Sequence, residues 1–469
     1  MPAYCQGYGG FSVFFSALLC EVKGLGPEAK YFLVRFIQCF GVTDLVCLGV
    51  KEFAKQVGVS DHQASAALDA LVDAEILIRS LVPNKRGKPA RCHGIAEAFL
   101  AKLNRLAVPV GAMHKAAIER LMVHVGTDAA EIRKFQDQEK AQSLAHLRAR
   151  KKSGSLNRVN RLLMAVLLCG ADRFGVVRNL GTVQICKATG LSKERLRNRF
   201  KTLMDQGLIR SYIPGLSSPV LAVKRKSVYY LNLNHAQLAG NGQATSILGV
   251  QGRNIYRAGP ELLQKIHFVV NKTKKDAKVV HGSSEALIVK ILAGQGPEFY
   301  RAFQALLEEY AAQLLSRHWL NLAEGGALAE RIDDLQLRQQ IQQDFRLPEG
   351  LQEIDDIGVS VARARFNEQL FTLAYDIALW IKSLLSNASN VPLSELDFVI
   401  APQHFAHANC YRALLALPKA EQGWNGCLVI DTSAPQALVS KVAGEQAIPL
   451  EELYLYGLRC RPGSGDVIK

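Results

Sequence analysis

Residues 183–233, VQICKATGLSKERLRNRFKTLMDQGLIRSYIPGLSSPVLAVKRKSVYYLNL, decide the fold expected of the first half of the chain. The pattern predicts a short helix, a tight turn at Gly190-Leu191, a second helix after Ser192, a strand, a basic loop and another strand. Ser192 is a favourable N-cap because its hydroxyl can accept a backbone N–H bond, and Glu194 lies near the positive end of the helix. The segment therefore predicts a helix-turn-helix followed by a β-hairpin.

The second of these helices combines an apolar stripe with a strongly basic remainder. Leu196, Phe200 and Leu203 recur at helical spacing, with Met204 beside them, and are expected to face a core. The other faces carry Lys193, Arg195, Arg197, Asn198, Arg199 and Lys201. Long cations neutralise phosphates, and Arg and Asn heads reach base edges in the major groove. A solvated basic face is the alternative, but the preceding turn and the following hairpin favour DNA contact.

The net charge of +15 is concentrated in the first half of the chain. Residues 1–235 hold 35 Lys and Arg against 17 Asp and Glu, whereas residues 236–469 hold 22 against 25. Nucleic acid is the partner expected for such a surface. An anionic membrane is a weaker alternative, because no basic amphipathic helix with an aromatic apolar face is present in the sequence.

An earlier stretch repeats the same order of elements. It comprises expected helices at Pro27–Phe40 and Val50–Val57, a turn at Gly58-Val59-Ser60, a helix capped by Ser60 and running through Ala74, a strand at Ile76–Val82 and a basic turn at Pro83–Pro89. Gly58 and Ser60 align with Gly190 and Ser192 at an offset of 132 residues. A repeated turn, cap and strand is stronger evidence than either stretch alone.

Both stretches resemble the helix-turn-helix core of the winged-helix superfamily, in the manner of bacterial regulators that include the MarR family. The resemblance implies that the helix after each turn enters the major groove and that each hairpin contacts phosphate or the minor groove. The residues so implied in the second copy are Lys193, Arg195, Arg197, Asn198, Arg199 and Lys201 with Lys224, Arg225 and Lys226 of the hairpin. Those in the first copy are Asp61, His62, Gln63 and Ser65 with Lys85, Arg86, Lys88 and Arg91.

The two copies are expected to differ in function. Asp61 and Asp69 would repel phosphate, so the first copy lacks the cationic helix of the second. His62 and Gln63 could still contact bases. Winged helices also serve as dimerisation or protein-docking modules, and this alternative stays open for the first copy.

We expect five segments along the chain: a first winged helix at 1–100, a helical basic linker at 101–155, a second winged helix at 156–235, a linker at 236–260 and a C-terminal helical domain with a few strands at 261–469. The basic end of the first linker is either an exposed, flexible connection or a tract that lies on the DNA backbone and sets the distance between the winged domains. In the last segment, Phe366–Leu385 has the broad apolar face of a bundle core or a dimer seam.

Two buried strands are expected near the end, at Phe398–Ala401 and Cys427–Ile430. Asp431 follows the second, and His404, His407 and Cys410 follow the first. These residue types can act in catalysis or bind a metal, but no catalytic or metal motif accompanies them, and capping and packing are favoured. No enzyme activity, metal or cofactor is therefore expected.

The ten cysteines are scattered, without a CxxC pair, and many lie in apolar runs. This usage is typical of reduced core cysteines in a cytoplasmic protein. No signal core or membrane span is evident.

The sequence thus predicts a mainly α protein with small β wings, in which two winged helices are joined by a helical linker and followed by a mostly helical α/β C-terminal domain. We expect a cytoplasmic, nucleoid-associated, bacterial transcriptional regulator that binds double-stranded DNA as a homodimer and docks a further protein through its C-terminal domain. The alternative is a replication initiator of a plasmid or integrative mobile element, since initiators of this kind carry two unequal winged helices in tandem.

Overall fold

The computed structural model describes residues 8–83, 89–106, 113–122, 156–239, 244–253, 291–292, 294–322, 332–348, 356–388, 390–403, 409–421, 423–433 and 437–461. The chain forms two compact units. The first comprises residues 1–173 and 180–206, and the second comprises residues 174–179 and 207–469. Within the described residues, no helix combines the length and the apolar character needed to cross a membrane.

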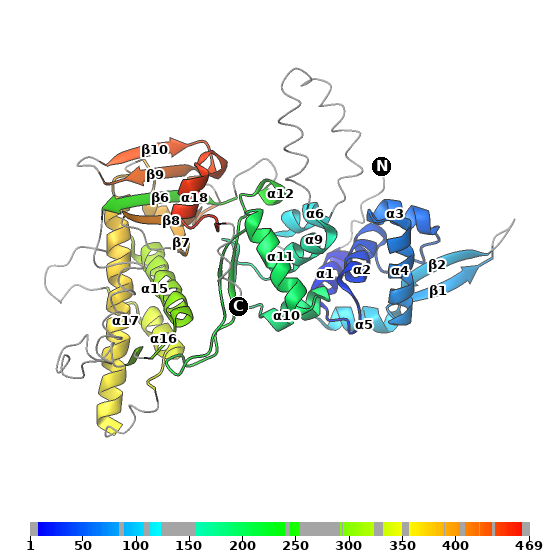
Figure 1. Ribbon diagram of the computed structural model, residues 1–469, viewed down its shortest axis with the longest axis horizontal. Coiled ribbons are helices and arrows are strands. Elements are labelled where there is room, and N and C mark those ends of the chain that lie inside the picture. The colour runs from blue at the N-terminus through cyan, green and yellow to red at the C-terminus, as the bar shows by residue number, and fades with distance from the viewer. Residues whose placement is uncertain are drawn as a thin grey trace, which may run out of the picture. The chain divides into compact units, whose positions relative to one another are not determined.

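The first unit is helical apart from one hairpin (Figure 1). Its elements are α1 (Tyr8–Leu19), α2 (Pro27–Phe40), α3 (Val50–Val57), α4 (Asp61–Asp73), β1 (Leu77–Val82), β2 (Ala90–Ile95), α5 (Glu97–Arg105), α6 (Lys115–Met122), α9 (Arg158–Cys169), α10 (Thr182–Thr189) and α11 (Lys193–Asp205). Helices α2 and α9 pack against each other, and α1 packs on both. Their facing side chains, among them Phe32 and Leu163, are fully buried.

The local predictions for both helix-turn-helix segments are confirmed. Each turn residue, Gly58 and Gly190, has a positive φ of 79° and 72° and donates its N–H to the last turn of the preceding helix. This left-handed conformation suits glycine because a Cβ atom would be strained there. Ser60 and Ser192 then cap α4 and α11 by accepting a backbone N–H bond from the residue three positions on.

The second unit is built around a five-stranded sheet of order β10-β9-β6-β8-β7, in which β6 and β9 are parallel and the other neighbours are antiparallel. A three-stranded sheet of order β3-β5-β4 belongs to the same unit. The strands are β3 (Val176–Val177), β4 (Ile209–Ile213), β5 (Val228–Leu231), β6 (Ser246–Arg253), β7 (Leu396–Ile400), β8 (Asn409–Pro418), β9 (Cys427–Asp431) and β10 (Leu438–Val442). The helices are α12 (Ala236–Ala239), α15 (Pro297–His318), α16 (Leu335–Asp344), α17 (Asp356–Leu385) and α18 (Leu450–Leu455), with short 3-10 turns η3 (Leu393–Glu395) and η4 (Glu445–Ala447).

Helices α15 and α17 lie together on one face of the large sheet (Figure 1). Leu370, Phe371, Ala374 and Ile377 of α17 are buried in that core together with sheet residues such as Leu414. The broad apolar face of this helix is therefore a core face, which resolves the choice between bundle core and dimer seam. The opposite face of the sheet packs on residues around α18 and on the small sheet.

The central strand of the large sheet was not expected. Strand β6 lies between β8 and β9, yet its residues fall in the Gly-, Asn- and Gln-rich stretch that we interpreted as a linker. One of its glycines is closely packed, since a Cβ at Gly249 would lie 3.3 Å from the Tyr456 ring. The glycine that suggests a loop thus permits close contact within a sheet.

The expected fold class is wrong. The helices of the two helix-turn-helix segments share one compact unit, whereas the strands expected to complete the second winged helix, β4 and β5, belong to the other unit. The C-terminal part is also organised by a mixed five-stranded sheet rather than being mostly helical. One physical reason is the Arg210 side chain of β4, which is 1% exposed and forms a two-pronged ion pair with Glu445 of the second unit.

Candidate nucleic-acid interface

Helix α11 is held rigidly by its apolar stripe and its cap. Leu196, Phe200, Leu203 and Met204 are buried, as expected from their spacing. The Ser192 hydroxyl accepts the Arg195 N–H at 3.3 Å. Lys193, Arg197, Asn198 and Lys201 are exposed and Arg199 is half-buried. The helix therefore presents its basic residues on a fixed backbone.

The cations of α11 differ in whether an acidic side chain holds them. Arg195 forms an ion pair with Glu28 at the start of α2, with 3.0 Å between Nη2 and Oε1. Lys193, Arg197, Arg199 and Lys201 form no ion pair within the part of the chain that the structure describes. We call these four cations and Asn198 the α11 basic face. Lys193, Arg197 and Lys201 follow one another every four residues along one side of the helix, and Arg199 lies beyond Asn198 on the other side. No acid of the described residues neutralises them.

The residues expected in the second hairpin have other roles. Lys224 is exposed, but Arg225 forms an ion pair with Asp344, with 2.9 Å between Nη2 and Oδ2. Lys226 Nζ donates to the backbone oxygen of Asn179 at 2.9 Å. All three belong to the second unit, so the structure does not bring them together with the α11 basic face in one compact unit.

The candidate residues of the first copy are only partly available. His62 and Ser65 are exposed on α4, and Arg91 is exposed on β2. The Gln63 side chain is already engaged, because its Oε1 accepts bonds from Ser60 N–H and from Arg158 Nη1. Lys85, Arg86 and Lys88 lie outside the described residues, as does the basic linker tract at 146–155.

The two helix-turn-helix segments contact each other at both of their turns. Arg158, the first residue of α9, donates to Gly58 O at 2.9 Å and to Gln63 on α4. In the second segment, the turn at Gly190 packs on the residues just before α2. A Cβ atom added to Gly190 would lie 2.4 Å from Leu25 O. The distance between the segments is thus set by direct packing of their helices.

Sequence reasoning missed the acidic partners of this region. Glu28 holds Arg195, and Glu21 holds Lys187 of α10 with 3.0 Å between Nζ and Oε2. Each acid lies more than 160 residues from its partner in the chain. No local pattern could reveal them, because the packing of α1 and α2 on α9 and α10 brings these segments together.

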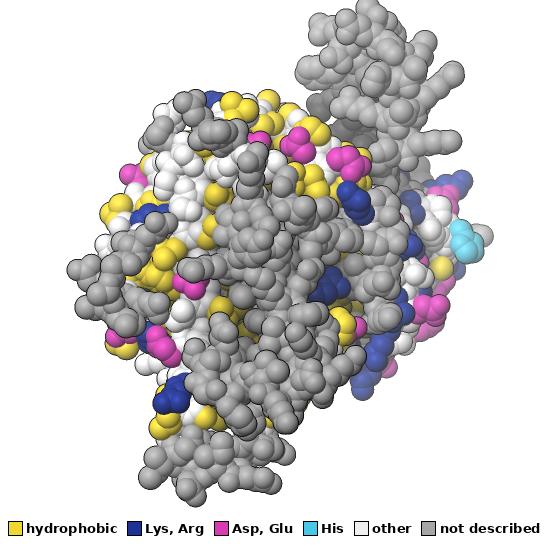
Figure 2. Space-filling view, turned by 60° about the vertical axis from the view of Figure 1, so that its left-hand side comes forward, with side chains coloured by type: hydrophobic (Ala, Val, Ile, Leu, Met, Phe, Trp, Pro, Cys, Tyr) yellow, Lys and Arg dark blue, Asp and Glu magenta, His cyan; other side chains and the backbone are white. Residues whose placement is uncertain are grey.

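Surface charge alone does not identify the interface. On the face drawn in Figure 2, the basic side chains of the described residues are interspersed with acidic ones and form no broad uniform patch. The pairing of individual cations is therefore more informative than their number.

The chain matches no family of known proteins, no curated protein sequence and no solved structure. The winged-helix resemblance thus has no support from these comparisons, and the function must be argued from the residues themselves.

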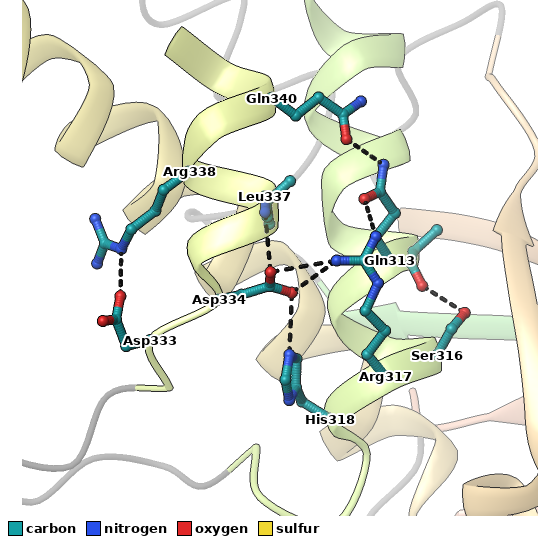
Figure 3. A network of polar contacts seen from close by, with 10 residues as sticks. Gln313, Ser316, Arg317, His318, Asp333, Asp334, Leu337, Arg338 and Gln340 are labelled. Atoms are coloured by element: carbon teal, nitrogen blue, oxygen red, sulfur yellow. Dashed lines mark hydrogen bonds and ion pairs between the residues drawn. The ribbon is translucent and has the colours of Figure 1, made fainter.

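One polar network in the second unit resembles a catalytic arrangement but caps helix α16 (Figure 3). Asp334 accepts bonds from His318 Nε2 at 3.0 Å, from Arg317 Nη1 and from Leu337 N–H at the start of α16. Burial by itself would raise the pKa of Asp334, but the Leu337 N–H bond and the neighbouring His318 and Arg317 lower it below the usual value. The nearby Ser316 hydroxyl is engaged with backbone groups of Ala312 and Phe398, so it is not activated by this His-Asp pair.

The acid expected after the last strand also has a local role. Asp431 Oδ1 accepts bonds from the backbone N–H and the hydroxyl of Ser433, at 2.8 and 2.5 Å. This is a side-chain turn at a strand end. His404 and His407 lie outside the described residues, and Cys410 is in β8. The described residues contain no group of three or more His, Cys, Asp or Glu arranged to hold a metal.

The expectation that the cysteines are reduced needs a correction. Cys47 and Cys92 form a disulfide that links the segment before α3 to β2. Val46 and His93 beside them exchange two backbone hydrogen bonds, at 2.8 and 2.9 Å, which brings the two cysteines opposite each other. Among the described cysteines outside this pair, Cys20, Cys169, Cys427 and Cys460 are buried, Cys186 is half-buried and Cys39 is exposed.

Proposed function

We propose that this protein binds double-stranded DNA sequence-specifically through the α11 basic face, and that it acts as a transcriptional regulator. The observation that carries the proposal is that Lys193, Arg197, Arg199 and Lys201 have no acidic partner among the described residues. They lie on one helix after a tight turn, with Asn198 between them. Long cations that surround an amide on a rigid helix suit phosphate and base-edge contacts in the major groove.

Electrostatics gives this proposal a quantitative form. Each phosphate neutralised by a cation releases counterions, so log affinity falls against log salt with a slope of about −0.9 per contact. Arg197 and Lys201 are four residues apart on α11, both exposed and neither paired within the described chain. Removing both charges should weaken binding and also flatten the salt dependence.

The test compares this pair with a matched pair on another helix of the same unit. A random-library selection first defines the bound sequence, and affinity is then measured for Arg197→Gln/Lys201→Gln and for Lys51→Gln/Lys55→Gln. Lys51 and Lys55 are also exposed, four residues apart and on one helix. We expect the α11 variant to lose about 2 kcal/mol or more, roughly 30-fold, if each contact contributes at least about 1 kcal/mol. Its salt slope should fall by about two.

Equal losses in both variants would indicate a nonspecific charge effect and contradict the assignment to α11. Selection of no sequence at all would contradict sequence-specific binding.

A replication initiator of a plasmid or integrative mobile element is the second candidate. It is favoured by the presence of two unequal helix-turn-helix segments in one compact unit, only one of which carries the basic face. The arrangement of natural sites separates the two functions. Direct repeats beside an AT-rich stretch would support the initiator, whereas an inverted repeat in a promoter would support the regulator.

A DNA partner would place the protein in the cytoplasm with the nucleoid. Disulfides are rare in that compartment, because glutathione and thioredoxin keep thiols reduced. The Cys47–Cys92 disulfide is therefore unusual for a protein of that compartment.

A further inference from the structure

The Cys47–Cys92 disulfide joins two segments that their backbones also hold together. The neighbouring pair, Val46 and His93, exchanges two backbone hydrogen bonds in an antiparallel register. The next pair in that register is Cys47 with Cys92, whose Cα atoms are 4.0 Å apart. Opposed side chains lie closest at such a position between hydrogen-bonded pairs. The backbone therefore keeps the two sulfur atoms within reach of each other whether or not the bond between them is formed.

The two cysteines differ in their access to solvent. Cys92 lies in β2 and is fully buried, whereas Cys47 lies in the segment before α3 and is exposed. A disulfide opens when a thiolate attacks one of its sulfur atoms, and the attack requires access to that atom. A dissolved thiol can thus reach the bond through Cys47 while the protein stays folded.

The other described cysteines do not combine a partner with access. Cys39 is exposed, but it is not bonded to another described cysteine, and burial raises the pKa of its thiol. Burial likewise raises the pKa of the half-buried Cys186. A raised pKa leaves less of the reactive thiolate at neutral pH. The remaining free cysteines that the structure describes are buried. The bonded pair is therefore the described cysteine site best suited to exchange with small thiols.

The compartment and the position of the bond both favour exchange over a permanent link. A DNA partner, as proposed above, places the protein in the cytoplasm, where disulfides are usually transient and redox-sensing. The two cysteines are 45 residues apart, and the loop that their bond closes contains α3, α4 and β1. This loop holds the whole first helix-turn-helix. A closed loop has less freedom when unfolded, so the bond stabilises this segment.

We propose that Cys47 is a modification site for low-molecular-weight thiols, through which the bond to Cys92 opens and closes and so changes the stability of the first helix-turn-helix. The thiolate of a small thiol attacks Cys47 Sγ and forms a mixed disulfide there. The Cys47–Cys92 bond breaks, and Cys92 leaves with the electron pair and takes up a proton.

A second small thiolate completes the reduction. It attacks the small-thiol sulfur of the mixed disulfide, so Cys47 leaves as a thiolate and the two small thiols are joined as their own disulfide. The two cysteines gain the two electrons that the small thiols lose. A small disulfide reverses both steps, because the backbone keeps Cys92 opposite Cys47. Only the cytoplasmic setting rests on the proposed function, and the exchange is measured without DNA, so absence of DNA binding cannot imitate absence of exchange.

The first experiment follows the wild-type chain in reduced glutathione without denaturant. Samples are quenched with an alkylating reagent, and mass spectrometry counts the thiols at Cys47 and Cys92. We expect the bond to open in the folded protein at a rate proportional to the glutathione concentration, because Cys47 is exposed. A bond that opens only at urea concentrations that unfold the protein would overturn the proposal.

Two variants then test which sulfur atom is attacked. Cys92→Ser removes the buried partner, so oxidised glutathione should leave a stable adduct on Cys47. Cys47→Ser is the matched control, and its buried Cys92 should take up glutathione at least about tenfold more slowly. Peptide mapping separates both adducts from any on Cys39, and circular dichroism shows whether the variants fold. Equal adduct formation at the two cysteines, or none on Cys47, would contradict the assignment. The wild-type experiment decides the case if a variant does not fold.

Hydrogen exchange tests the consequence for the fold. Amide exchange is compared between the oxidised protein and the same protein reduced with glutathione. We expect exchange in α3 and α4 to be at least about tenfold faster after reduction, because the closed loop is released. Helices α10 and α11 lie outside the loop and serve as the internal control. Unchanged exchange in α3 and α4, or equal acceleration in all four helices, would rule out control of the first helix-turn-helix by this bond.

Discussion

Helices α4 and α11 share the same turn, cap and buried stripe, but their exposed residues carry opposite charges. Both follow a left-handed glycine, are capped by a serine and bury an apolar stripe. The exposed residues of α4 include three acids, Asp61, Asp69 and Asp73, whereas those of α11 include three cations, Lys193, Arg197 and Lys201, without an acidic partner among the described residues. Turn and cap thus specify the backbone, whereas the exposed residues that the backbone carries specify what the helix can bind.

The similarity extends to the helices that precede them. Lys30 is the fourth residue of α2 and donates to Cys20 O just after α1, while Arg161 is the fourth residue of α9 and donates to Leu121 O in α6. The chemistry differs in one respect. Burial lowers the pKa of Lys30 to about 8, whereas a guanidinium stays charged at any accessible pH.

The largest effect should be common to both segments. Leu71 of α4 and Leu203 of α11 are both fully buried, so Leu71→Ala and Leu203→Ala should each lower the free energy of unfolding by about 2–5 kcal/mol. Val183→Ala on α10 is the control, because Val183 is 53% exposed and should cost less than about 0.5 kcal/mol. Urea unfolding measures all three. If only one of the two leucine variants lost little free energy of unfolding, the two helices would not be structurally equivalent.

The pH dependence of stability should distinguish α2 from α9. The pKa of Lys30 is about 8 when folded and 10.5 in the unfolded reference, so the folded state binds fewer protons between these values. The contribution of Lys30 to stability should therefore rise as pH increases from about 8 to about 10.5, by an amount on the order of 2 kcal/mol. The buried thiols of Cys169 and Cys427, whose pKa values are raised to about 12, oppose this rise equally in both proteins, so the urea midpoint of the wild type should rise relative to that of Lys30→Met, which has no amine to titrate. Parallel curves for the two proteins would contradict a buried, perturbed Lys30.

The smallest effect concerns the acid beside α11. Glu28→Gln releases Arg195 and removes a negative charge next to the basic face, so DNA affinity should rise by about two- to threefold. Stability should change by less than about 1 kcal/mol, since both partners of this pair are substantially exposed. Glu97→Gln, at the first turn of α5, is the matched control and should leave affinity unchanged. An equal gain in both variants would show that only net charge matters.

Local structure was the part most accessible from sequence. The expected helices at Pro27–Phe40 and Val50–Val57 coincide with α2 and α3, because proline at N1, glycine after the last turn and apolar spacing are all local signals. The strand β8 gave no such signal, since its Ala- and Leu-rich sequence also suits a helix. Its strand conformation is imposed by pairing with β6 and β7.

The sequence predicted which basic residues the candidate site contains, but it did not predict which of them are already held by acidic side chains. The basic composition of α11 follows from the sequence, but the commitment of Arg195 to Glu28 and of Arg225 to Asp344 does not. Side chains 100 residues or more apart in the chain meet only when the elements that carry them pack.

The turns, caps and apolar stripes of both helix-turn-helix segments follow from the amino-acid sequence, because these features depend on residues within a few positions of one another. Long-range packing places their helices in one unit, β4 and β5 in the other, and β6 at the centre of a sheet. This packing depends on buried contacts such as the ion pair of Arg210 with Glu445. Burial of a charged side chain is tolerated only when an opposite charge is buried beside it, and here that charge comes from a distant part of the sequence.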